Sequence, residues 1–310
     1  MSGRTSPSST PTTSRASSRG AVPERGGSAQ RLPRGLVVLA FASAAAVVVL
    51  YLLVVRTYWG QRLDEHSFVG HDFFASRAAQ ADSFLRIVSI GSLLLAAVAV
   101  VRRRPRLAIF AAASIGVSVL ATEILKHSLL ERPNLVASFI FDNSYPSGHT
   151  TVGMAVAVAA MLVVPRRLLV PTAIGAGLFG SAFGVAVVAA GWHRPSDAVG
   201  AFLVVIAVGA AFAALSHAFP DRADTAERHG RRIPLPRIRI GTTELGLLAM
   251  ALGGLGLFAL AALSYRGIPW TSTSAGFLLS ALAIVVCGLA ATLTLAGTML
   301  AAEEPRRPPA

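Results

Sequence analysis

Two histidines in this sequence stand beside residues that could assist them in catalysis. His149 closes the run Pro-Ser-Gly-His at 146–149, and His193 is followed by Asp197 four residues later. At that spacing a carboxylate can hydrogen-bond one nitrogen of the imidazole ring, which fixes the tautomer and leaves the second nitrogen as a nucleophile. The other histidine could serve as a general acid and base. This pattern predicts covalent catalysis at His193, assisted by His149.

Charged residues ahead of these histidines supply cations. Lys126 is the only lysine of the chain. It belongs to a cluster just before Pro133, a residue type that stops a helix from continuing: Glu123, Lys126, His127, Glu131 and Arg132. Glu123 is expected to pair with Lys126, which lies three residues further along a helix. Lys126 and Arg132 could nevertheless face one bound anion.

The residues at 147 and 148 would add donors from the backbone. Ser147 or Gly148 can act as the N-cap of a helix, where free N–H groups and the positive end of the helix dipole attract phosphate. His193 would then attack phosphorus, Asp197 would steady the imidazolium, and His149 would protonate the leaving oxygen before it activates water. The two cations and the two amides would hold the phosphate oxygens. No metal is required, and this part of the sequence offers no set of ligands with metal-binding spacing.

The elements that must position these residues are membrane helices. Hydrophobic residues make up 54% of the chain and charged residues only 14%, fewer than in soluble domains. Apolar runs long enough to cross about 30 Å of hydrocarbon recur along the sequence. Hydropathy predicts eight spans, at 35–55, 87–101, 107–125, 149–164, 168–190, 197–218, 244–263 and 274–300. The expected fold class is all-α, a polytopic membrane helix bundle.

The basic residues predict the orientation of this bundle. The net charge of +13 comes from arginines in short blocks between the spans rather than on one face, which argues against a nucleic-acid-binding protein. Of the 28 basic residues, 20 fall in segments that share one face: 1–34, 102–106, 166–167, 222–239 and 306–307. Basic residues near span ends stay in the cytoplasm. We therefore expect both termini in the cytoplasm and both histidines at the outer face of the plasma membrane.

Composition divides the chain into five parts. The first 34 residues are rich in Ser, Thr, Pro and Gly, and cannot bury enough surface to fold alone. A second basic stretch, at 219–242, holds three prolines and six arginines. The predicted parts are a disordered basic cytoplasmic tail (1–34), a six-helix membrane core (35–218), a cytoplasmic linker (219–242), a transmembrane helical hairpin (243–300) and a cytoplasmic tail (301–310).

Three motifs, in this order, resemble those of the type-2 phosphatidic acid phosphatase superfamily, which comprises six-helix membrane lipid phosphatases and related soluble haloperoxidases. The first motif, Lys, a spacer and Arg-Pro, is matched by Lys126 and Arg132 with the proline that follows. The second, Pro-Ser-Gly-His, is intact at 146–149, and the third ends with His193 and Asp197. The resemblance covers about 107–218, and it implies a phosphatase whose six-helix core carries the site.

Two departures from the family pattern bear on phosphate binding. Five residues separate Lys126 from Arg132, where the family has six. The third motif of the family begins with Ser-Arg, and here Ala186 and Val187 occupy those places. The second phosphate-binding arginine of the family is therefore missing. Arg194 could replace it, or it could instead contact lipid headgroups at the rim.

The sequence favours a metal-independent phosphatase that needs no cofactor and removes phosphate from a lipid-linked phosphate or diphosphate at the outer membrane face. Substrates implied by the family include polyprenyl diphosphate, phosphatidate and phosphatidylglycerophosphate. Two alternatives stay open. One is a lipid phosphotransferase on the same scaffold. The other is a catalytically impaired membrane transport or binding protein, an alternative suggested by Val187 in the place of the family's arginine. The expected partners are the lipid-phosphate substrate and membrane lipids.

Overall fold

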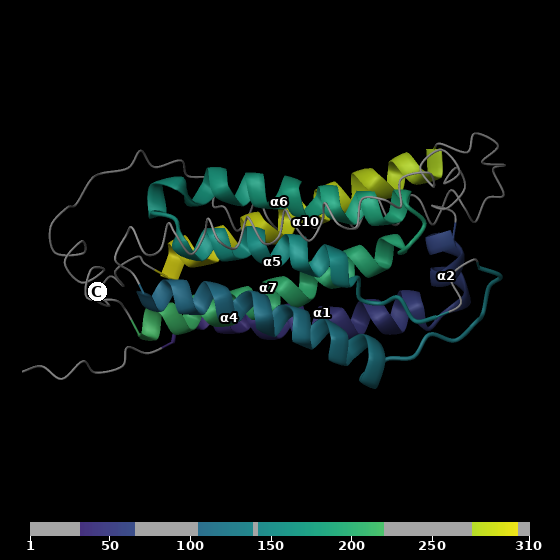
Figure 1. The fold of residues 1–310 in the computed structure, drawn as a ribbon, viewed down its shortest axis with the longest axis horizontal. Coiled ribbons are helices and arrows are strands. Elements are labelled where there is room, and N and C mark those ends of the chain that lie inside the picture. The colour runs from purple at the N-terminus through teal and green to yellow at the C-terminus, as the bar shows by residue number, and fades with distance from the viewer. Residues whose placement is uncertain (1–31, 66–104, 139–141, 220–274, 303–310) are drawn as a thin grey trace, which may run out of the picture.

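The computed structural model describes residues 32–65, 105–138, 142–219 and 275–302, which form helices joined by loops (Figure 1). The α-helices are α1 (Arg34–Leu50), α2 (Tyr58–Glu65), α4 (Pro105–Ile124), α5 (Gly148–Val163), α6 (Arg166–Ala189), α7 (Pro195–Ala218) and α10 (Ala275–Ala302). Two of them continue into a π-helical turn, α1 into η1 (Tyr51–Val55) and α4 into η5 (Leu125–Leu129). Within the described residues there is no strand, so the all-α prediction is confirmed for them.

Five of the helices in the described part are long and apolar enough to cross a membrane: Arg34–Val55, Arg106–Leu129, Arg166–Ala189, Pro195–Ala218 and Gly276–Ala302. Helix α5 is apolar too, but it has only 16 residues. These six helices correspond to predicted spans, with ends that agree to within a few residues. The other two predicted spans, 87–101 and 244–263, lie outside the described residues, as do most of the predicted linker and both predicted tails.

The long helices lie side by side along the long axis of the molecule (Figure 1). Helices α1, α4 and α6 run from left to right in this view, and α5, α7 and α10 run in the opposite direction. As a result, the C-terminal ends of α1 and α4 meet the N-terminal ends of α5 and α7 at one end of the bundle. The short helix α2 lies at the same end. This arrangement brings the three predicted motifs together.

The core of the bundle lies between α5, α6, α7 and α10. Met154, Phe202, Ile284 and Leu295 are each no more than 2% exposed and belong to one cluster of apolar side chains. Helices α6 and α10 approach closely, since a Cβ atom at Gly177 would lie only 2.8 Å from the Thr292 Oγ1 atom. Small residues at helix contacts are typical of membrane bundles. Helix α10, the second helix of the predicted hairpin, thus packs into the same core as α5 and α7.

Large apolar side chains also point away from the bundle. Phe41, Leu53, Ile109 and Leu282 are between 59% and 74% exposed. In water such a surface would favour association with another apolar surface. On helices of membrane-spanning length it is the surface that lipid covers. The outward faces of α1, α4 and α10 therefore agree with a protein that sits in a bilayer.

Candidate active site

His193 is positioned by the turn between α6 and α7. Gly191 has a φ of 71°, a left-handed conformation that glycine adopts without strain. The N–H of Trp192 donates to the carbonyl of Val187 at 3.0 Å, and the N–H of Gly191 donates to the carbonyl of Val188 at 3.0 Å. These two bonds form the Schellman motif that ends many helices. They turn the chain sharply, so that His193 leaves α6 and stands at the entrance to α7.

The imidazole of His193 is held on one side by polar atoms. Its Nδ1 atom lies 3.4 Å from the Asp197 Oδ2 atom and 3.2 Å from the carbonyl oxygen of Ser144. The same Oδ2 atom accepts hydrogen bonds from the Ser144 hydroxyl at 2.6 Å and from the Arg194 N–H at 2.8 Å. The predicted contact between His193 and Asp197 is therefore present. With Nδ1 engaged in this way, Nε2 is the ring nitrogen left for other chemistry.

The second histidine lies across from the first. The ring centroids of His149 and His193 are 6.2 Å apart, and the ring of Trp192 lies 5.5 Å from that of His149. His149 is exposed, whereas His193 is only 6% exposed. Helices α5 and α7 thus bring both histidines to one end of the bundle, as the sequence predicted. The two rings differ in access to solvent.

The N-terminus of α5 is tied to α7. Ser147 is the N-cap, and its hydroxyl accepts a hydrogen bond from the N–H of Thr150 at 3.3 Å. The N–H of Ser147 donates to the carbonyl of Asp197 at 3.0 Å, so this amide already has an acceptor within the protein. Neither Ser147 nor Gly148 lines the cavity described next. Phosphate binding by Ser147 and Gly148 therefore stays a prediction.

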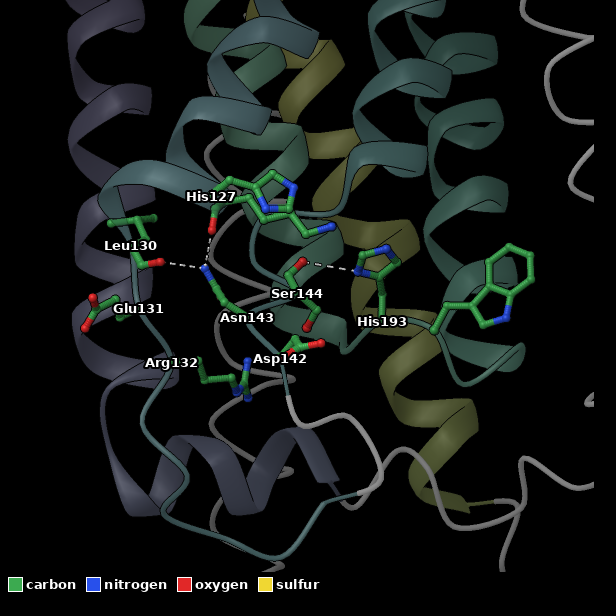
Figure 2. A pocket seen from close by; sticks show the side chains of 10 residues that line it. His127, Leu130, Glu131, Arg132, Asp142, Asn143, Ser144 and His193 are labelled. Atoms are coloured by element: carbon green, nitrogen blue, oxygen red, sulfur yellow. Dashed lines mark hydrogen bonds between the residues drawn. The ribbon is translucent and has the colours of Figure 1, made fainter.

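A cavity of about 790 Å³ opens beside His193 (Figure 2). Its lining is mostly polar and comes from the end of α4, the loop before α5 and the turn before α7: Lys126, His127, Leu130, Glu131, Arg132, Asp142, Asn143, Ser144, Trp192 and His193. The Asn143 side chain donates to the carbonyls of Lys126 at 2.9 Å and Leu130 at 2.7 Å. Asn143 therefore fastens the loop before α5 to the end of α4 and gives the cavity its shape.

Lys126 lies on the π-helical turn η5, which widens the end of α4. π-Helical turns are frequent at functional sites. The expected pair of Glu123 with Lys126 is wrong, because the Glu123 carboxylate lies 3.2 Å from the Nε2 atom of His127 instead. Spacings of three and four residues are both compatible with a helical pair, and the local turn decides between them. The Lys126 ammonium makes no hydrogen bond or ion pair with any residue that the structure describes.

Arg132 lies between two buried carboxylates. Its side chain is 2% exposed, and its Nη2 atom donates to the Asp64 Oδ2 atom at 3.1 Å. Its Nη1 atom lies 3.7 Å from the Asp197 Oδ1 atom, which is too long for a hydrogen bond. Both of these atoms are buried and have no hydrogen-bond partner in the described part of the chain. Arg132 therefore lines the cavity, while its Nη1 atom stays buried beside Asp197 without a hydrogen bond to the described residues.

Arg194 points away from the cavity, although its side chain is also only 2% exposed. Its three guanidinium nitrogens donate to the Glu65 carboxylate at 2.8 Å, the Ser144 hydroxyl at 3.1 Å and the Ser138 hydroxyl at 2.6 Å. Val187, which stands where the family has arginine, is a residue of α6 and is only 1% exposed. The prediction that Arg194 holds phosphate stays a prediction, since a phosphate would have to displace one of these partners.

Sequence reasoning missed the residues of α2. Gln61 donates to the carbonyl of Pro133 at 2.6 Å and accepts from the N–H of Leu135 at 3.2 Å. Asp64 and Glu65 bind the two arginines described above. The polar residues at 61, 64 and 65 share one side of a helical turn, a spacing that could have indicated a buried polar face.

Within the described residues, no group of three or more His, Cys, Asp or Glu is placed to hold a metal ion.

Comparison with known families identifies the segment that carries the site. The family model of the PAP2 superfamily matches residues 107–222, which extend from α4 to just beyond α7. The matched segment includes Lys126, Arg132, both histidines and Asp197, whereas Asp64 and Glu65 lie outside it. Comparisons with curated proteins and with solved structures return no significant match.

Proposed function

Because residues 107–222 match the family model of the PAP2 superfamily, which includes membrane phosphatases, we propose that this membrane protein removes phosphate from a lipid-linked phosphate or diphosphate. One feature supports the proposal above all. His193, backed by Asp197, and the cations Lys126 and Arg132 line one cavity at the end of helices long enough to span a membrane, and His149 lies beside it. This is the set of groups that phosphoryl transfer through a covalent intermediate requires.

In the first step, the Nε2 atom of His193 attacks phosphorus. A P–N bond forms, and the bond between phosphorus and the leaving oxygen breaks with its electron pair on that oxygen. His149 donates a proton to the leaving oxygen, which departs as the lipid alcohol or, from a diphosphate, as the lipid monophosphate. The Asp197 carboxylate, 3.4 Å from Nδ1, stabilises the positive charge that the ring acquires.

In the second step, water attacks the phosphohistidine. His149, now neutral, accepts a proton from the water while the new P–O bond forms. The P–N bond breaks, and its electrons return to the imidazole of His193. Inorganic phosphate leaves, and both histidines regain their starting states. No additional reactant enters this cycle.

The phosphate oxygens need cationic partners during both steps. Lys126 is suited to this role because the residue is half-buried and lines the cavity, and its ammonium has no hydrogen bond or ion pair with the described residues. Arg132 is suited to it because its guanidinium carries a positive charge and the residue lines the same cavity. Gly148 and Ser147 would contribute the positive end of α5 rather than a direct contact. Arg194 would join the set only if the substrate draws it away from Glu65.

The lipid character and the outer location of the substrate are part of the proposal. The cavity opens at the ends of the helices, where the headgroups of a bilayer would lie. Tyr58 and Trp59 of α2 are 47% and 62% exposed at this end, as expected for aromatic side chains at a membrane interface. The distribution of arginine along the sequence favours the outer face of the plasma membrane for this end.

The proposal is tested with full-length protein purified in detergent and a panel of lipid substrates: phosphatidate, phosphatidylglycerophosphate and a polyprenyl diphosphate. We expect release of inorganic phosphate from at least one of them. The release should survive EDTA, should be inhibited by vanadate, which resembles the five-coordinate transition state, and should disappear in His193→Ala.

The other outcomes separate the alternatives. Phosphate that appears only on an added acceptor alcohol would identify a lipid phosphotransferase. A second outcome is a purified protein that is folded, as shown by a cooperative unfolding transition, and yet releases no phosphate from any substrate. That result would indicate a transport or binding protein that has lost activity.

A further inference from the structure

Helix α2 has an unusual distribution of side chains. Gly60, Gln61 and Asp64 are buried, whereas Tyr58 and Trp59 are exposed. The polar side of this helix therefore faces the protein, and its aromatic residues face outwards. Burial of polar side chains costs free energy unless they find partners. The partners that α2 finds are the loop after α4 and the start of α7, which are the two segments that carry Arg132 and His193.

Asp64 joins these two segments directly. Its side chain is 3% exposed. The Oδ2 atom accepts from the Ser196 hydroxyl at 2.6 Å and from the Arg132 guanidinium at 3.1 Å, and Oδ1 accepts from the Ser196 N–H at 3.2 Å. Ser196 is the second residue of α7 and lies next to Asp197 in sequence. One carboxylate thus fixes the position of an arginine relative to the start of the helix that bears Asp197.

The position of Arg132 has a consequence for Asp197. Arginine and carboxylate groups prefer bidentate pairs with N–O distances below 3 Å. Arg132 stands 3.7 Å from Asp197 and pairs with Asp64 instead. If Asp64 lost its charge, Asp197 would become the nearest carboxylate to the guanidinium. Arg132 would then compete with His193 for Asp197.

The ionisation of Asp64 depends on the same arrangement. Burial raises the pKa of the Asp64 carboxyl above its usual range, and the nearby carboxylate of Asp197 acts in the same direction. The Arg132 guanidinium and the hydrogen bond from Ser196 lower the pKa and offset part of this rise. Arg132 thus favours the charged form of Asp64, and charged Asp64 holds Arg132 in place.

We propose that Asp64 is a positioning residue of the active site, which holds Arg132 towards the cavity and off Asp197 so that Asp197 is left to His193. The proposal rests on the proposed phosphatase activity. Asp64 itself touches neither the substrate nor the reacting atoms. It lies outside the segment that matches the model of the PAP2 superfamily.

The test compares kcat and KM for phosphate release by full-length variants in detergent, on the substrate that the wild type cleaves best. In Asp64→Asn the side chain keeps its volume and can still accept from Ser196, but it loses the charge that holds Arg132. We expect kcat to fall roughly 10- to 100-fold, as misplacement of catalytic groups by about 1 Å can cause. Asp64→Glu should recover part of this loss because it restores the carboxylate.

A double-mutant cycle shows whether Asp64 acts through Arg132. Arg132→Gln should itself lower kcat, and adding Asp64→Asn to it should lower kcat by no more than about threefold further, since contacting residues are not additive. Arg62→Gln is the matched control on the exposed face of α2 and should leave kcat and KM near the wild-type values.

The two levels of the proposal fail in different ways. If the wild type releases no phosphate from any substrate, the proposed function fails and the role of Asp64 falls with it. If the wild type is active and Asp64→Asn keeps kcat within about twofold, or if its effect multiplies fully with that of Arg132→Gln, the positioning role alone is overturned.

Discussion

At the scale of single residues, Ser144 links three others: His193, Asp197 and Arg194. Its carbonyl oxygen faces the Nδ1 atom of His193, and its hydroxyl donates to Asp197 while it accepts from Arg194. Arg194 therefore reaches Asp197 through the Ser144 hydroxyl and through its own backbone N–H, rather than through the cavity. In this geometry the charge of Arg194 stabilises the folded site, and its counter-ion is Glu65.

This geometry predicts the effect of removing Arg194. In Arg194→Ala the carboxylate of Glu65 loses its partner in a largely buried position, and such changes cost about 3 to 5 kcal/mol. We expect a clearly lower unfolding midpoint, followed by tryptophan fluorescence in detergent. Adding Glu65→Gln should restore part of the loss, because the glutamine carries no charge.

The opposite pattern would point to phosphate binding. In this case Arg194→Ala would leave the unfolding midpoint near that of the wild type and would mainly raise KM. Such a result would mean that Arg194 of the wild-type protein leaves Glu65 and binds the substrate. In that case Glu65→Gln would not improve the stability of Arg194→Ala. It would instead lower KM in the wild-type background, since the arginine would no longer be held back.

Residue spacing predicted some of these contacts and not others. His193 and Asp197 are four residues apart in one turn, and the local geometry of a helix start brings them together. The pair of Arg132 with Asp64 joins residues 68 positions apart, and no local rule reveals it. Burial of the Arg132 side chain could not be predicted either, because it depends on α2 covering the loop. Sequence therefore predicted the contact between His193 and Asp197 but missed the residues that surround it.

At the scale of the elements, hydropathy predicted the long helices well. The expected span at 149–164 corresponds to α5 at Gly148–Val163, and the span at 197–218 corresponds to α7 at Pro195–Ala218. Proline and serine at a helix start explain why α7 begins two residues early. Helix α2 was not predicted because it is short and its buried side is polar. A pattern search for apolar periodicity does not detect such a helix.

The turn before α7 determines the position of His193. The Schellman motif at the end of α6 uses only backbone atoms and the left-handed Gly191. The turn needs no arginine at Val187, which is buried and contributes its carbonyl oxygen. The loss of the family's arginine there is therefore compatible with an intact position for His193.

At the scale of the whole molecule, the alternating direction of the helices gathers the site at one end (Figure 1). The exposed Arg166 and Arg167, at the start of α6, lie at the other end. Basic residues near helix ends favour the cytoplasmic side. The two ends of the bundle should therefore face opposite sides of the plasma membrane, with the cavity outside.

Cysteine labelling in intact cells tests this orientation. In a chain carrying Cys287→Ser, one cysteine is placed at Asp142, which is exposed at the cavity, or at Arg167, which is exposed at the opposite end. An impermeant thiol reagent should label the Asp142→Cys protein in intact cells and the Arg167→Cys protein only after lysis. The reverse pattern would overturn the orientation and place the cavity in the cytoplasm.

The most direct measurement of the central claim is the capture of the covalent intermediate. A lipid substrate that carries radiolabel in the transferred phosphate is mixed with the purified protein, and the reaction is stopped within its first turnover by alkaline denaturation. We predict protein-bound label that is stable in alkali, is lost in acid, maps to the peptide containing His193 and is absent from His193→Ala. Rapid release of phosphate with no label on the protein, together with an active His193→Ala, would contradict catalysis through a phosphohistidine.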